Sequence, residues 1–503
     1  MGWLGNLSRA SGLTVAEANE IDALCNAFRA QRRRNARLER YYEGDVGPRS
    51  IGPDTMLSQV KLDVDLSCDW PRKAVHSLSS LVKFDGFVFG DGSGYDGAGD
   101  ELDATLRDCG FESAFARHKV GMLKKGCMFA TVGTDDGGVY VRFHSADTAT
   151  AIIDTTTERI RSGMCVAASG PTEWSPKKSV PTQVNVYGRG WLLRLDRTSP
   201  STWAATHVTV PDGVCMMVAM GYRPTDTKPL GSSRITKSVM DLTDDVLHLR
   251  QVLVLSSELY AIPMRYIVGL TAGNMEALKE NPKWALYLNP VFTATRDAKS
   301  GKTPELGQLP ANSPAAILEL IYADAKMFAG ATGVPLNSLG IVQDNPNSAE
   351  AIAEGRKDLT DEAQDLIDGQ LTPAFREIAL LVMMVTNNVS SPAELDDARR
   401  SVMPKFRNPA MPSISASTDA AMKIASVMPE FANTRTFFEM TGMDGATITR
   451  TLHEMRLNRM RANTPSLLGN TLGMNQQRQQ GAMPDGNLLS RAGEGDDASD
   501  IAQ

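Results

Sequence analysis

Apolar residues recur at three- or four-residue spacing through a long segment in the last third of the chain, which predicts an amphipathic helix. These positions are Ile352, Leu359, Ala363, Leu366, Leu371, Phe375, Ile378, Val382 and Val385. Asn347 can cap free backbone amides and Glu350 can complete a capping box, so we predict a helix from residue 347 or 348 to Thr386. Pro373 removes a backbone donor, so we expect a bend between residues 369 and 373.

A second helical pattern precedes this one, from Ser313 to Phe328. Its predicted apolar side carries Ile317, Leu318, Ile321, Tyr322 and Met327. A polar segment, Gly340-Ile-Val-Gln-Asp-Asn-Pro-Asn347, separates the two helices. The pattern therefore predicts a helix, a polar loop and a longer helix in succession.

The same periodicity predicts further helices on both sides of this region. They cover residues 14–44, 65–84, 229–261, 417–428, 434–441 and 446–461, with two more after Glu101. Gly44 can take the left-handed conformation that ends the first of them. Apolar positions of the helix at 229–261 are Ile235, Val239, Leu242, Val246, Leu249, Leu253 and Leu259.

Short stretches of β-branched and aromatic residues between turn signals predict eight strands in the middle of the chain. They are Phe129–Gly133, Gly138–Phe143, Ala149–Ile153, Gly163–Ala168, Thr182–Tyr187, Trp191–Leu195, Trp203–His207 and Cys215–Ala219. An insert follows at residues 263–308, with strands at 265–268 and 284–288, a helix at 274–280 and a loop ending at Gln308. The fold class that these patterns predict is α+β with an antiparallel sheet.

The composition is that of a folded protein of several domains, with 503 residues, 42% apolar and 22% charged. The net charge of -7 excludes a surface that holds nucleic acid by bulk attraction. The predicted helix at 14–44 carries a basic run, at Arg29, Arg32, Arg33, Arg34, Arg37 and Arg40. We interpret this run as a solvated face or a subunit contact in preference to a DNA contact.

Residues 341–390 have the opposite character, with nine acidic positions (344, 350, 354, 358, 361, 362, 365, 368, 377) and three basic ones (356, 357, 376). An acidic face that lines a channel would repel phosphates and let DNA slide. The alternative is that most of these carboxylates face solvent or a neighbouring subunit.

The sequence contains fragments of nucleotide-binding and metal-binding motifs, but none of these motifs is complete. Gly301-Lys-Thr303 lacks the glycine that a P-loop needs five residues earlier, where Arg296 stands. The segment Gly90–Asp100 fails as a calcium loop, because Leu102 occupies the position of the bidentate glutamate. His144 and His207 have no partners at metal-ligand spacing. We therefore expect no enzyme, no catalytic residue, no metal and no cofactor.

The cellular compartment follows from the cysteines and the hydropathy. The six cysteines form no C-x-x-C pair, which favours free buried thiols in a reducing compartment. The start of the chain lacks the features of a signal peptide, and no apolar run approaches the ~20 residues that cross a bilayer. We expect a protein made in the cytoplasm, with no membrane partner.

Four short motifs, in this order, resemble the portal proteins of tailed bacteriophages of the long-tailed siphophage type. They are Tyr41-Tyr-Glu-Gly-Asp45, Pro229-Leu-Gly-Ser-Ser-Arg-Ile235, Tyr260-Ala-Ile-Pro-Met-Arg-Tyr-Ile-Val-Gly269 and Asn345-Pro-Asn-Ser-Ala-Glu-Ala-Ile352. The resemblance covers roughly residues 14–462 and is least specific in the insert.

The resemblance implies a mainly helical portal fold with named parts. These are a wing with an antiparallel sheet (1–230), a first stem helix (231–262), a small α/β clip (263–308), a second stem helix (309–331), a tunnel loop with a long kinked wing helix (332–390), and a helical crown (391–462). Residues 463–503 have the composition of a disordered tail.

The function that the resemblance implies is a homo-oligomeric ring, commonly of twelve subunits, at one capsid vertex of the virion. Double-stranded DNA would pass through its channel without sequence-specific contacts during packaging, retention and ejection. Expected partners are the terminase large subunit, the major capsid and scaffolding proteins and the head-tail adaptor protein. Another structural component, such as a minor head protein or adaptor ring without a DNA channel, and an enzyme such as the packaging motor are the alternatives.

The resemblance also suggests the residues that would act. The expected tunnel loop, at the narrowest part of the channel, consists of Ile341, Val342, Gln343, Asp344, Asn345, Pro346 and Asn347. Since Val342–Asn347 has no large aromatic residue and no lysine cluster, we expect steric and backbone contacts with DNA. Lys299 and Lys302 are candidate clip contacts to DNA or a partner protein.

Overall fold

The computed structural model describes residues 2–47, 66–89, 98–135, 138–261, 265–268, 305–308, 313–341, 354–387, 389, 401–410, 414–443 and 445–463. The chain forms two compact units, Met1–Ala410 and Met411–Gln503. Helices and strands are mixed in the first unit, and the second unit is helical where it is described. The predicted α+β class is confirmed.

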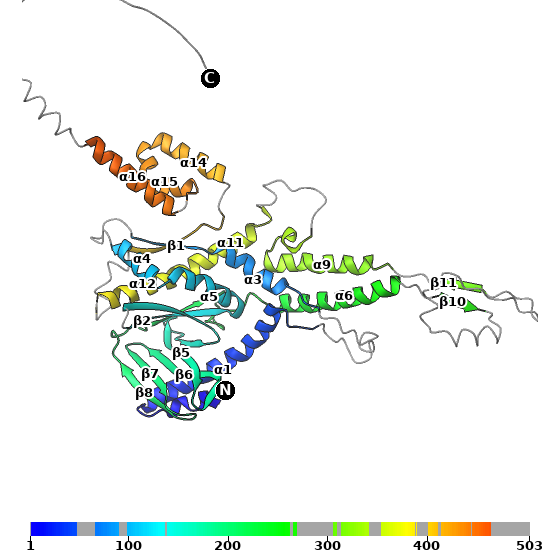
Figure 1. Ribbon diagram of the computed structural model, residues 1–503, viewed down its shortest axis with the longest axis horizontal. Helices are drawn as coiled ribbons and strands as arrows, with labels where there is room; N and C mark the ends of the chain where they lie inside the picture. The colour runs from blue at the N-terminus through cyan, green and yellow to red at the C-terminus, as the bar shows by residue number, and fades with distance from the viewer. Residues whose placement is uncertain are drawn as a thin grey trace, which may run out of the picture. The chain divides into compact units, whose positions relative to one another are not determined.

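Two antiparallel sheets make up most of the β structure of the first unit (Figure 1). A five-stranded sheet has the order β4-β5-β6-β7-β8, and a three-stranded sheet has the order β3-β2-β9. The strands are β2 (Cys127–Asp135), β3 (Gly138–Ser145), β4 (Ala149–Ile153), β5 (Ile160–Thr172), β6 (Ser175–Gly188), β7 (Trp191–Arg197), β8 (Trp203–Val208) and β9 (Met217–Gly221). All eight predicted strands are present. Each is a short stretch rich in β-branched and aromatic residues that is bounded by turn residues.

Helices α1 (Val15–Glu43), α4 (Ala98–Asp108) and α5 (Phe111–Lys125) pack against strands of these sheets, and α3 (Trp70–Leu81) packs against α1 and α5. Thr14 and Glu17 form a capping box at the start of α1. Gly44 ends the helix with φ 74°, in the left-handed conformation that the sequence predicted.

One strand pair was missed by the sequence analysis, which predicted no strand at either place. β1 (Phe84–Phe89) pairs antiparallel with β12 (Val402–Phe406). Phe84 and Phe406 face each other in this pair, and both contact the ring of Phe375 with centroids 5.0 and 5.1 Å apart. Aromatic packing therefore stabilises a pairing between residues far apart in the chain.

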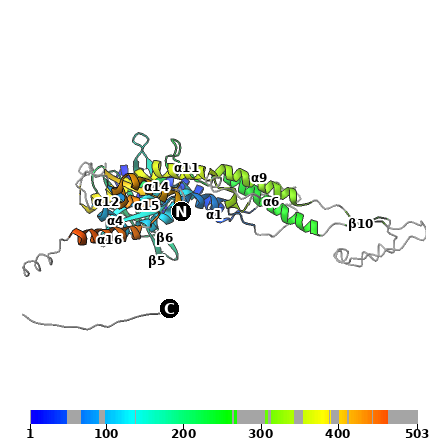
Figure 2. The ribbon, with the colours of Figure 1, turned by 90° about the horizontal axis from the view of Figure 1, so that it is seen from above.

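Helices α6 (Lys237–Ala261) and α9 (Ala315–Thr332) run side by side in both views (Figures 1 and 2). Both predicted helices are confirmed, and α9 continues past Phe328. The predicted apolar side of α9 is not buried: Leu318, Tyr322 and Met327 are 39%, 49% and 60% exposed. The prediction that these residues form a buried face is therefore wrong. Only Ala325, Phe328 and Thr332 of this helix are buried, because α9 packs mainly against α6 within the described residues.

The insert between these helices is described at two places. β10 (Arg265–Val268) pairs antiparallel with β11 (Glu305–Gln308). The strand at 265–268 is confirmed, whereas the loop predicted to end at Gln308 is wrong there, because those residues complete the ladder with β10. The predicted helix at 274–280 and strand at 284–288 lie outside the described residues.

Asp324 on α9 is expected to destabilise the folded unit at neutral pH. Burial first, and the nearby Asp245 carboxylate on α6 second, raise the pKa of Asp324 above its usual value. A raised pKa means that the folded protein binds the proton more readily, so stability falls as pH rises through the folded pKa. Asp324→Asn should therefore raise the denaturant midpoint at pH 7 and leave it nearly unchanged below pH 4. Glu319→Gln, at an exposed position on the same helix, is the matched control and should leave both midpoints unchanged.

The long helix is described as α11 (Lys357–Leu366), a π-helical turn at Ile367–Leu371 and α12 (Thr372–Thr386). The π turn lies at the predicted irregularity before Pro373, whose missing N–H prevents regular α-helical bonding. Of the predicted apolar positions, Leu359, Ala363, Leu366, Leu371, Phe375, Ile378 and Val382 are buried. A turn at residues 355 and 356 interrupts the predicted helix, and its predicted start lies outside the described residues.

The second unit contains α14 (Ile414–Val427), a short 3-10 helix (Pro429–Asn433), α15 (Arg435–Met440) and α16 (Gly445–Asn463). The three predicted helices are thereby confirmed. The predicted tail at 463–503 begins inside α16, which includes Asn463, and residues 464–503 lie outside the described residues.

Candidate functional site

The predicted site residues lie mostly outside the described part of the chain. Ile341 is the last described residue before the polar loop, and Val342–Asn347, Lys299 and Lys302 are not described. Their roles stay predictions. The structure does describe the two ends of the segment that carries the loop, and the contacts that hold these ends.

The two ends of the loop segment lie against each other. α9 ends at Gly333, whose N–H donates to the carbonyl of Ala329 (2.8 Å) in a left-handed cap with φ 65°. A Cβ added at Gly333 would lie 3.4 Å from the backbone nitrogen of Leu359, in the first turns of α11. The two ends of the segment that contains the polar loop, Gly333 and Asp358–Leu359, therefore lie close together. Val334 remains in the buried core after Gly333, and the described chain continues to Ile341.

Arg234, just before α6, is 4% exposed and bonds to both sides of the place where the end of α9 meets α11, which we call the junction. Its Nε donates to the carbonyl of Ala74 on α3 (2.7 Å), and its Nη2 donates to the carbonyl of Thr332 at the end of α9 (2.6 Å). Its Nη1 donates to the Tyr222 hydroxyl (3.0 Å) and forms an ion pair with Glu362 on α11. One buried guanidinium just before α6 thus connects α6 with α3, α9 and α11, next to the loop segment.

The motif Pro229–Ile235 places Arg234 by close backbone packing. Gly231 has φ 88°, and a Cβ there would lie 2.6 Å from the carbonyl oxygens of Gly126 and Tyr222. Only glycine fits such an approach. The N–H of Arg234 then donates to the carbonyl of Leu123 at the end of α5 (2.8 Å). The sequence indicated only a helix start here, and gave no signal for a buried ion pair.

Glu362 has three partners in this network. Tyr222 donates its hydroxyl proton to the carboxylate, Arg234 pairs with it inside the protein, and the exposed Arg223 approaches it to 3.2 Å. Burial raises the pKa of Tyr222 to about 12, so the hydroxyl stays a donor. Glu362 is one of the nine acidic positions in residues 341–390. Because its carboxylate is paired with Arg234 and Arg223, it does not contribute an unpaired negative charge to the surface.

A second set of contacts fixes α1 to the same region through the motif Tyr41–Asp45. The Tyr41 hydroxyl donates to the Asp244 carboxylate on α6 (3.0 Å). Tyr42 hydrogen-bonds His76 on α3 (2.8 Å), and Glu43 pairs with Arg72 (2.9 Å). The motif therefore attaches the N-terminal helix to α3 and α6.

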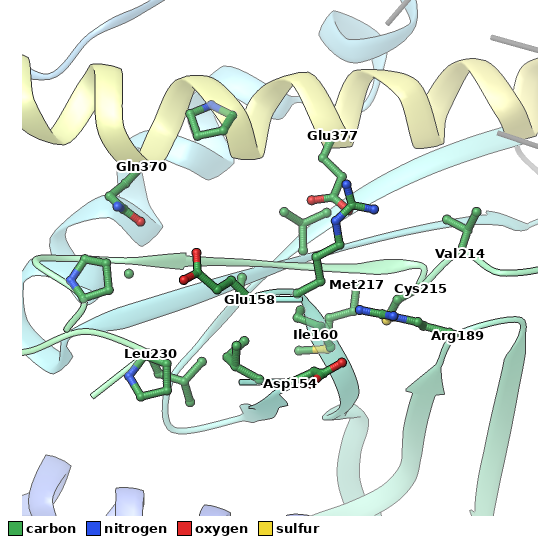
Figure 3. Close-up of a pocket in the computed structure, with 18 of the residues that line it drawn as sticks. Asp154, Glu158, Ile160, Arg189, Val214, Cys215, Met217, Leu230, Gln370 and Glu377 are labelled. Carbon is green, nitrogen blue, oxygen red and sulfur yellow. The ribbon is translucent and has the colours of Figure 1, made fainter. Parts of the chain in front are cut away.

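A cavity of about 1000 Å³ lies between the sheets and the long helix. Figure 3 shows Gln370 and Glu377 pointing from this helix toward Glu158 and Arg189. Cys215 also lines it, but burial raises the pKa of this thiol to about 12, so it is not a reactive thiolate. The cavity offers mixed charges without a nucleophile and its base.

Three findings bound the chemistry further. The described residues contain no group of three or more side chains suited to hold a metal ion. All six cysteines are free, five of them buried and Cys109 half-buried. Among the described helices, none is both long enough and apolar enough to cross a bilayer.

Comparison with known proteins confirms the resemblance to tailed-phage portal proteins. The chain is 25% identical over 406 residues to the portal protein of Mycobacterium phage L5, covering 76% of this chain and 77% of that protein. It is 24% identical over 414 residues to the portal protein of Mycobacterium phage D29, covering 80% and 81%. No protein-family model matches the chain.

Proposed function

We propose that this protein is a phage portal protein, a structural component of the virion without catalytic activity. The observation that carries the proposal is the similarity to two portal proteins over about four fifths of the chain. The paired helices α6 and α9, followed along the chain by the polar loop and the long helix that contains α11, support it, because they follow the order of stem helices, tunnel loop and wing helix.

The parts of the chain take the following roles in this proposal. The first unit contains the wing up to residue 230, the stem helices at 231–262 and 309–331, the clip at 263–308, and the loop with its long helix at 332–390. The crown occupies residues 391–462. Ile341–Asn347 form the narrowest part of the channel when repeated around a ring, and Lys299 and Lys302 face DNA or a partner at the clip.

A ring would also account for the exposed apolar side chains of α9. Leu318 and Tyr322, one turn apart on one side of the helix, are 39% and 49% exposed in the single chain, and Leu320 and Met327, on roughly the opposite side, are 54% and 60% exposed. Large exposed apolar side chains are typical of surfaces that associate. Neighbouring subunits in a ring, commonly twelve, would cover them.

The ring occupies one capsid vertex and encloses double-stranded DNA during packaging, retention and ejection. It binds the terminase large subunit during packaging and the head-tail adaptor protein afterwards, and it assembles with the major capsid and scaffolding proteins.

Negative-stain microscopy tests the architecture. Class averages along the ring axis should show rings of about twelve subunits around an opening as wide as a DNA duplex. Protein that stays monomeric alone should form such rings when scaffolding and capsid proteins are added. Particles without a central opening under both conditions would contradict the proposal, as would ATP turnover by the purified protein.

A further inference from the structure

One face of α1 carries a row of arginines. Arg29, Arg33, Arg37 and Arg40 recur at intervals of four, four and three residues, which keeps them on one side of the helix. Arg33, Arg37 and Arg40 are exposed, and Arg29 is half-buried. No described carboxylate forms an ion pair with any of the four. We call these four residues the basic row.

One face of α11 and the π turn after it carries a row of aspartates. Asp358, Asp361, Asp365 and Asp368 recur at intervals of three, four and three residues, and all four are exposed. Asp368 accepts a hydrogen bond from Gln364 (2.9 Å), and no described cation pairs with any of the four carboxylates. We call these four residues the acidic row. Glu362 is not part of it, because its carboxylate points inward to Arg234.

The two rows match in length and oppose each other in charge. At 1.5 Å per residue, the basic row spans about 16 Å and the acidic row about 15 Å. Each row offers four charges of one sign along one helix face, and the acidic row ends at Asp368 in the π turn. Such a pair of surfaces is complementary in both charge and spacing.

The rows do not meet within one subunit. α3 packs against both α1 and α11 and lies between them (Figure 1). The buried sides of the two helices, with Leu38 and Tyr41 on α1 and Leu359 and Ala363 on α11, face this packing. The two charged rows therefore face solvent at two separate surfaces of the same unit.

We propose that the basic row of one subunit binds the acidic row of the next subunit in the ring. This inference rests on the proposed portal function. Two different surfaces of one chain that bind each other make a head-to-tail contact, which closes into a ring when the rotation fits. DNA would satisfy only the basic row and would be repelled by the acidic row. A second copy of this chain neutralises both.

The contact sets the register of the subunits more than their affinity. Single exposed ion pairs contribute little, so the apolar surfaces supply most of the association energy, and the charged rows select the orientation. Screening predicts that rings loosen as salt concentration rises.

Charge reversal tests the pairing. Arg33→Glu with Arg37→Glu should reduce the ring fraction at physiological salt by about tenfold, and Asp361→Arg with Asp365→Arg should do the same. The four substitutions combined should restore rings to within about twofold of the unsubstituted protein, because the pairs re-form with exchanged signs. Ring fraction is measured by mass photometry and microscopy, with circular dichroism to confirm folding.

A matched control is Arg456→Glu with Arg459→Glu on α16, which makes the same charge change at exposed positions outside both rows. It should leave the ring fraction unchanged. Reversals that each disrupt rings without rescue by the combination would overturn the proposal, as would reversals that leave rings intact. Either result would leave the portal function standing, whereas failure of the unsubstituted protein to form rings under any assembly condition would contradict that function itself.

Discussion

Replacing Arg234 by alanine should lower the free energy of unfolding of the first unit by about 3–5 kcal/mol, because it leaves a largely buried carboxylate without its inner partner. Glu362 would keep only the exposed Arg223 and the Tyr222 hydroxyl. The carbonyls of Ala74 and Thr332 would also lose the hydrogen bonds that Arg234 donates to them. Lost hydrogen bonds to a buried charged group add to the cost of an unpaired carboxylate.

The measurement is denaturant unfolding followed by tryptophan fluorescence, since Trp70 contacts Phe328 with ring centroids 5.0 Å apart near this junction. Arg223→Ala removes the exposed partner of the same carboxylate and is the matched control, with an expected cost below about 1 kcal/mol. Arg234→Lys should fall between the two, because it keeps the charge but not the three-way donation. Equal stability of the Arg234 and Arg223 alanine variants would show that the junction does not depend on this guanidinium.

Local pattern predicted the helices and the eight strands of the two main sheets, because each depends on the periodicity of its own side chains. The β1–β12 pair depends instead on contacts between Phe84 and Phe406, which are far apart in the sequence. A single sequence contains no signal for such a partner. β11 was read as a loop for the same reason, since β10 supplies its hydrogen bonds.

The junction shows a different limit of sequence reasoning. Arg234 stands in a recognisable helix opening, but nothing local indicates that it is buried or that Glu362 lies beside it. Counting acidic residues grouped Glu362 with Asp361 and Asp365, although its side chain turns inward while theirs are exposed. Helix periodicity separates the three only when the packing partner of α11 is known.

The exposed apolar residues of α9 show that sequence periodicity predicts an apolar helix face but does not predict which surface packs against it. Leu318 and Tyr322 lie on the predicted side, yet α6 leaves them exposed in the single chain. Under the ring proposal, their partner is another copy of the protein. The prediction of an apolar face is then compatible with its exposure in one subunit.

Deleting Gln343–Asn347 should leave rings intact and abolish DNA packaging or retention, if these residues form the narrowest part of the channel. The anchors of the loop segment are Gly333 against Leu359 and Arg234 with Glu362, and all four lie outside the deletion. Gly333 and Leu359 lie close together on either side of the loop segment, so a shorter segment can still join them at small entropic cost. The folded unit and its subunit contacts should therefore persist.

The readouts are ring formation by microscopy, DNase-protected DNA per capsid for packaging, and DNA released from filled heads for retention. A five-residue deletion of Gly92–Asp96, in the glycine-rich stretch before α4, is the control for chain shortening and should package normally. Because the loop lacks aromatic residues and lysines, alanine substitution of Gln343 and Asn345 alone should have a much smaller effect than the deletion, as expected for steric and backbone contacts. Normal packaging and retention by the deletion variant would refute a role at the constriction, and loss of rings would show that the loop acts in assembly instead.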